Sequence, residues 1–190
     1  MTLRQAVVGV AGNPWNHLFR AWNWKSALFS SLIRGGIFFA VNRRAGFEAA
    51  TAAMGVEALY AAGAAGFWGS LVQAFRKVEP PWQAAAALGL LVPGAAHLLE
   101  AAAHWLNKTP NLRASVLASM AFSALSMLFN LHMMRQGVMI VGHGRRPLRD
   151  DFRQIPFVIA TFLITGVRLW VRGAALLREF LLRRPEGRLL

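Results

Sequence analysis

Long apolar runs separated by short polar connectors cover most of this chain. Helices of about 20 mostly apolar residues can cross a bilayer, and several of the runs approach or exceed that length. The alternating segments of about ten residues that build a membrane β-barrel are not found. The pattern therefore predicts an all-α integral membrane protein with four to five transmembrane or re-entrant helices in one bundle. The expected segments are residues 26–42, 46–75, 82–106, 112–134 and 155–171.

The two ends of the chain differ from this bundle. Trp15, Trp22 and Trp24 alternate with basic residues, a mixture typical of the membrane interface, so residues 1–25 are expected to contain an amphipathic interfacial helix. Residues 172–190 form a basic amphipathic C-terminal tail. We therefore interpret residues 1–190 as a single membrane domain, with 26–171 as its helical bundle.

Small residues and proline add detail within the bundle. Four of the glycines in the second segment would let helix backbones approach closely, and packing within the chain is favoured over a dimer interface. They are Gly55, Gly63, Gly66 and Gly69. In the third segment, Pro93 cannot donate a backbone hydrogen bond, which predicts a kink near Gly89. The first segment is short and contains Arg34 and Gly35–Gly36, so a tilted span and a re-entrant hairpin both remain open.

Composition agrees with a membrane location. Hydrophobic residues make up 56% of the chain and charged residues only 15%, against about 25% in a typical soluble domain. Arginine outnumbers lysine and alanine is abundant, as in proteins from GC-rich bacteria, so we expect a multi-pass protein of a bacterial cytoplasmic membrane. The absence of cysteine excludes disulfides, thiolate catalysis and cysteine-ligated metals.

The net charge of +13 indicates anionic membrane lipids as partners, and not nucleic acid, because the basic residues lie mostly at the ends of apolar runs. Basic residues divide evenly between the two sides of a five-span arrangement, so orientation is not predicted. Residues 137–144, followed by Arg145–Arg146, could form a phosphate-binding loop, but no strand–helix unit surrounds them and a headgroup-contacting connector is favoured. The expected headgroup contacts are Arg43, Arg44, Arg145, Arg146 and Arg172.

Ionisable residues inside an apolar run mark the candidate site. His97, Glu100 and His104 share one face of a helix because they are spaced i, i+3, i+7. If the chain folds back at the turn before Pro80–Pro81, Glu57 and Glu100 are equally far along the chain from that turn. The two carboxylates would then lie at the same depth in the membrane. A charged group in the centre of a span costs about 2.5–3.5 kcal/mol on insertion scales, so such residues usually have a function.

A stripe of polar residues follows on the fourth segment, within an arc of roughly 80° at 100° per residue. It consists of Ser115, Ser119, Ser123, Ser126 and Asn130. Such a stripe faces a bundle interior or a water-filled cavity.

Three interpretations of this site remain open. The first is a small proton- or cation-linked transport or conduction protein, in which Glu57, Glu100 and the two histidines titrate. The second is a metal-dependent membrane enzyme acting on a lipid or quinone, with Zn or Fe favoured over haem, although the Glu-x-x-His motif of di-metal bundles is missing. The third is a non-catalytic structural subunit of a larger membrane protein complex, or a homo-oligomer.

Overall fold

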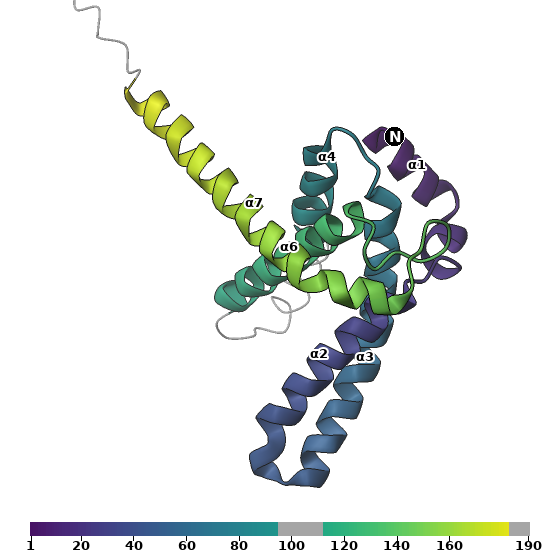
Figure 1. The fold of residues 1–190 in the computed structure, drawn as a ribbon. Helices are drawn as coiled ribbons and strands as arrows, with labels where there is room; N and C mark the ends of the chain where they lie inside the picture. The colour runs from purple at the N-terminus through teal and green to yellow at the C-terminus, as the bar shows by residue number, and fades with distance from the viewer. Residues whose placement is uncertain (95–111, 183–190) are drawn as a thin grey trace, which may run out of the picture.

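The computed structural model describes residues 1–94 and 112–182, without the side chains of 112–116, 118–119 and 180–182. Every regular element in these ranges is helical, which confirms the all-α prediction. The elements, shown in Figure 1, are α1 (Leu3–Gly12), the π-helical turn η1 (Trp15–Phe19), α2 (Trp24–Asn42), the 3₁₀ turn η2 (Arg43–Ala45), α3 (Phe47–Phe75), α4 (Pro81–Ala86), the π-helical turn η3 (Ala87–Leu91), α6 (Leu112–Arg135) and α7 (Leu148–Leu182).

One region, which we call the head, contains most of the buried apolar side chains. Its core lies where α1, the end of α3, α4, η3 and α6 meet, with Phe75, Leu88 and Leu131 among its members. A second cluster, centred on Met133, Met139 and Val158, joins α6 and α7 to the connector at residues 136–147. The head therefore holds the packed interior of the described residues.

Helices α2 and α3 form a long antiparallel hairpin that projects from the head, as Figure 1 shows. The turn at its far end consists of η2 and Gly46, whose φ of 106° favours glycine. Helix α2 runs unbroken through Gly35–Gly36, because Gly35 packs against Met54 and Ala58 of α3. Its 19 residues correspond to about 28 Å, close to the thickness of a bilayer's hydrocarbon core.

The α3 glycines divide into two groups. A Cβ on Gly66 would lie 2.0 Å from the indole of Trp22, and one on Gly69 would lie 2.8 Å from Ser26. Gly55 and Gly63 have no such neighbour within 4 Å among the described residues. The head-side glycines thus permit close packing within the chain, as the sequence predicts.

Helix α7 is longer than the sequence predicts. It begins at Leu148, before the start of the expected fifth segment (155–171), and continues past that segment to Leu182 as one helix of 35 residues. Pro156 lies within it, and Figure 1 shows a bend in its first third, after which α7 leaves the head in a different direction from the hairpin. Within the described residues, Leu148–Glu179 is the one helix long and apolar enough to cross a membrane by length and composition.

Two other local differences have a backbone cause. The expected N-terminal helix is divided into α1 and η1, because α1 ends at Gly12 with Asn13 as its C-cap, and the following Pro14 lacks a backbone donor. The irregularity expected before Pro93 takes the form of η3, whose Gly89 lies so close to α6 that an added Cβ would be 3.0 Å from Leu128.

Candidate functional site

A buried ion pair lies where the hairpin joins the head. Lys25, in the first turn of α2, pairs with Asp151 in the first turn of α7, and the two side chains are 1% and 0% exposed. Lys25 Nζ also donates to the carbonyl oxygen of Arg146 at 2.6 Å. Among the described residues Asp151 Oδ1 accepts no hydrogen bond. The pair therefore links the hairpin, the connector and α7 at one point without satisfying every polar atom.

Two side-chain amides lie beside this pair and clamp the connector. Buried Asn23 caps α2 by accepting from Ser26 N, and it donates to Met139 O at 2.9 Å. Gln73 of α3 accepts from Val141 N at 2.9 Å and donates to Val141 O at 3.0 Å. Asn23 and Gln73 also bond to each other at 3.2 Å. We call Asn23, Lys25, Gln73 and Asp151 the polar junction.

The connector needs this support because its backbone is unusual. Met139 is fully buried with a φ of 57°, in the left-handed region that non-glycine residues rarely occupy. Gly137, Gly142 and Gly144 have similar positive φ values. The junction fixes a conformation that the connector would not hold alone.

The polar junction was not predicted from the sequence. Lys25 is one of the basic residues that alternate with Trp15, Trp22 and Trp24 in the expected interfacial segment, and Asp151 had no predicted role, because a charge beside an apolar run is usually solvated. One local signal was available, since an Asn before an apolar helical run is a common N-cap.

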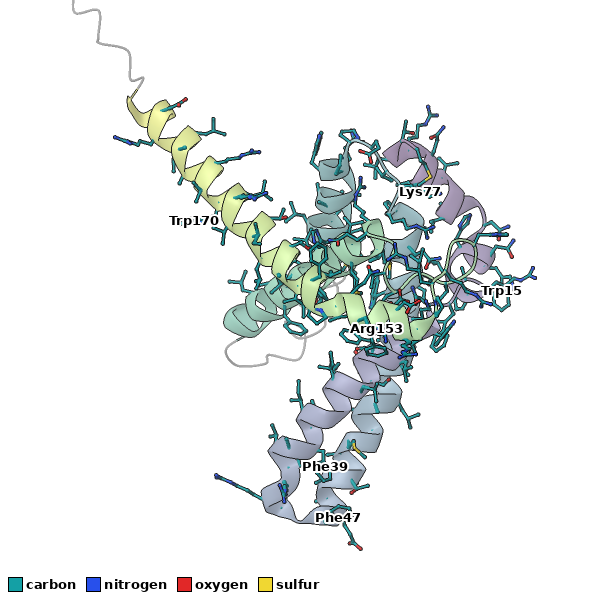
Figure 2. All side chains as sticks on the ribbon, in the orientation of Figure 1. Trp15, Phe39, Phe47, Lys77, Arg153 and Trp170 are labelled. Carbon is teal, nitrogen blue, oxygen red and sulfur yellow. The ribbon has the colours of Figure 1, made fainter. Side chains whose placement is uncertain are left out.

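Glu57 is the one member of the predicted Glu/His site within the described residues. It forms an ion pair with Arg34 of α2, with Nε and Oε1 2.5 Å apart, and the guanidinium also lies 5.9 Å from the ring centroid of Tyr60. Figure 2 labels Phe39 and Phe47, which lie toward the tip of the same hairpin. His97, Glu100 and His104 lie outside the described residues, so their proximity to Glu57 stays a prediction.

The predicted serine stripe lies on α6, where Ser115 and Ser119 have no described side chains. Ser123 and Ser126 are partly buried, and Asn130 Nδ2 donates to Ser126 O at 3.0 Å. Two residues after Asn130, His132 lies 3.0 Å from Thr161 of α7, and Gln136 contacts both side chains. Residues two apart in a helix point in nearly opposite directions, so these polar contacts between α6 and α7 lie on a different face of α6 from the stripe.

The five arginines predicted to contact lipid headgroups are all exposed. Arg43 and Arg44 lie at the hairpin tip, Arg145 and Arg146 in the connector at its other end, and Arg172 on the outer part of α7. Arg146 is also tied to the head, because its guanidinium donates to Gln154 at 2.7 Å.

Within residues 1–94 and 112–182, no three histidine or acidic side chains group in a way that could hold a metal ion. The polar junction holds α2, α3, α7 and the connector together. The Arg34–Glu57 ion pair places two opposite charges between the two helices of an apolar hairpin. Comparison with protein-family models, curated proteins and solved structures finds no significant match.

Proposed function

We propose that this chain is a multi-pass membrane protein whose hairpin and outer α7 lie in the bilayer, and that it acts as a structural subunit of a larger membrane protein complex. The observation that carries the proposal is the large apolar surface that stays exposed on the hairpin and on the outer part of α7. Large side chains stay exposed along both projections, including Leu59 at 78% and Trp170 at 76%. Monomeric soluble proteins rarely expose continuous apolar patches beyond a few hundred Å².

The hairpin has further properties that fit insertion. Between Leu28 and Val41 of α2 the only charged residue is Arg34, and its pairing with Glu57 reduces the cost of taking either group out of water. Exposed arginines lie at the hairpin tip and in the connector beside its other end, where headgroups would lie. A bacterial cytoplasmic membrane remains our expected location.

The outward face of α3 supports a role as a subunit. Val56, Leu59 and Gly63 are exposed there, and Gly63 leaves room for another backbone. Close packing on small residues is a common way for helices to associate in lipid, where burial of apolar surface gives little driving force. A neighbouring helix would therefore find a suitable surface on this face.

Cysteine accessibility tests the topology, since the chain has no native cysteine. We expect Arg44→Cys and Arg145→Cys to react with an impermeant maleimide from opposite sides of sealed vesicles, and Leu59→Cys to stay unreactive. Leu59→Cys reacting as fast as Arg44→Cys would contradict insertion.

The subunit role is tested by native electrophoresis of gently solubilised membranes, where migration at the mass of a single chain would contradict it.

Proton- or cation-linked transport is the second candidate, favoured by the Arg34–Glu57 pair. An ionisable pair within a span commonly serves an ion pathway, and predicted depth places Glu100 level with Glu57. Proteoliposomes containing Glu57→Gln should lose flux, whereas Glu48→Gln, at the start of α3 near the tip, should keep it. Equal flux in the two variants would exclude a role for Glu57.

A further inference from the structure

A basic pocket lies in the head, at the end of the hairpin away from its tip. It has a volume of about 430 Å³ and forms where α3 and α6 both end against the connector. Its charged or titratable lining residues are Arg76, Lys77, Arg135 and His143, and Met134 and Ile140 contribute apolar surface. Figure 2 places Lys77 at the head end of the molecule, opposite Phe47 at the hairpin tip. Part of the lining, including His143, comes from residues 137–144, the segment for which the sequence favours a headgroup-contacting connector over a phosphate-binding loop.

Arg135 already has partners that explain its position. It donates to the carbonyl oxygens of Arg76 and Val78 at 3.1 and 2.9 Å, and to Glu79 Oε1 at 2.5 Å. Arg135 therefore caps the carbonyl end of α3, and Glu79 neutralises it. Glu79, the acidic residue closest in sequence to the pocket-lining residues, is therefore already paired with Arg135.

Arg76 and Lys77 are left without such a partner. Within the described residues, neither side chain forms a hydrogen bond or an ion pair, and Arg76 is partly buried. That burial lowers the pKa of Arg76 below its usual value, because the charged guanidinium is partly removed from water. A bound anion would offset this desolvation.

We propose that the basic pocket binds the phosphoryl group of a small anionic ligand, held by Arg76 and Lys77 with His143 at its rim. Guanidinium and ammonium groups are the usual protein partners of phosphate. The volume lies within the 300–1,000 Å³ range of small-molecule sites, so it accommodates a phosphate with a small headgroup attached. The phosphoryl group belongs to an anionic lipid or to a soluble phosphate compound. The proposal is independent of membrane topology, because the pocket belongs to the head.

Calorimetric titration of the full chain in neutral detergent tests this proposal. The probes are inorganic phosphate and short-chain phosphatidylglycerol, with acetate at matched ionic strength as the control anion. We expect saturable binding of at least one phosphate probe and none of acetate. Tighter binding of phosphatidylglycerol than of phosphate identifies a lipid headgroup as the source, and the reverse order identifies a soluble phosphate compound.

Substitutions then locate the site. Arg76→Gln combined with Lys77→Gln should weaken binding at least about tenfold, because charge-assisted hydrogen bonds are lost. Arg149→Gln combined with Arg153→Gln removes the same charge from exposed positions outside the pocket and should change affinity less than about twofold. Lys77→Gln alone changes an exposed side chain, so it gives a readout even if the double variant misfolds. Equal weakening by both double variants, no weakening by Lys77→Gln, or binding of acetate as tight as phosphate would overturn the proposal.

Discussion

A buried lysine and a buried aspartate together hold the base of the hairpin. Each charge alone would lose several kcal/mol of hydration free energy on burial, and their mutual attraction recovers this only when the geometry is good. Lys25 is well satisfied, because it bonds to both Asp151 and the Arg146 carbonyl. Asp151 is less so, because Oδ1 lacks a partner among the described residues. The pair therefore specifies an arrangement of helices more than it adds net stability.

Removing one charge of this pair should be far more damaging than removing both. Asp151→Asn should lower the free energy of unfolding by about 3–5 kcal/mol, because Lys25 stays buried without a counter-charge. Lys25→Met combined with Asp151→Leu should recover much of that loss. Equilibrium unfolding of the detergent-solubilised variants measures their free energies of unfolding.

The neighbouring carboxylate supplies the matched control for this prediction. Asp150 is only partly buried, so Asp150→Asn should cost less than about 1 kcal/mol. Similar losses for Asp150→Asn and Asp151→Asn would show that the buried pair has no special role.

At the scale of an element, α3 performs two different tasks along its length. Its head-side turns contact the Trp22 indole and the capped start of α2 so closely that the side chain of any residue larger than glycine would overlap them. Its tip-side turns contact α2 on one side and are uncovered on the other. The same small-residue composition therefore gives close packing within the chain at one end and an open surface at the other.

Two glycine substitutions in α3 separate these tasks. Gly66→Ala should destabilise the fold, because its Cβ would overlap the rigid Trp22 ring and force the helices apart. Gly63→Ala should be neutral or stabilise by about 0.5–1 kcal/mol, because it removes backbone freedom in the unfolded chain and meets open space. Thermal unfolding of both variants measures the difference, and a Gly66→Ala variant as stable as Gly63→Ala would contradict the packing described.

At the scale of the whole molecule, one packed head carries two apolar projections. Figure 1 shows the hairpin and the outer part of α7 leaving it in different directions. From Leu163 to Glu179 every residue of α7 is exposed, whereas Asp151, Ile155 and Val158 are buried in the head. The head therefore depends on the start of α7 and not on its outer part.

Shortening the chain within α7 tests whether the head depends only on the start of that helix. A chain that ends at Gly166 should keep the head's helical content and unfolding temperature in detergent within a few degrees, because the removed residues are exposed. A chain that ends at Pro147 should unfold far more easily, because it lacks Asp151 and the buried start of α7. Circular dichroism during heating measures both, and equal losses would contradict the division.

Much of the element structure could be predicted from sequence, and much of the site could not. Helical boundaries near Asn42 and Phe75 follow from where apolar runs end, because local composition controls where a helix can continue. The partner of Glu57 could not be predicted in this way. Hairpin depth predicts Glu100 on the next segment, which lies outside the described residues, and it gives no indication of Arg34 on the preceding helix, which the structure places beside Glu57. Rotation of a helix about its axis decides such pairs, and spacing along one chain does not fix it.

The sequence by itself determined that the protein is helical, strongly basic and rich in apolar runs, because these properties follow from composition and local periodicity. Only the tertiary structure decided that Lys25 meets Asp151 across 126 positions, and that Gln73 holds Val141. It also decided which glycines are enclosed, and where two basic side chains with no partner among the described residues line a pocket. These are long-range contacts, and they depend on how helices turn and pack against each other, which no local pattern encodes.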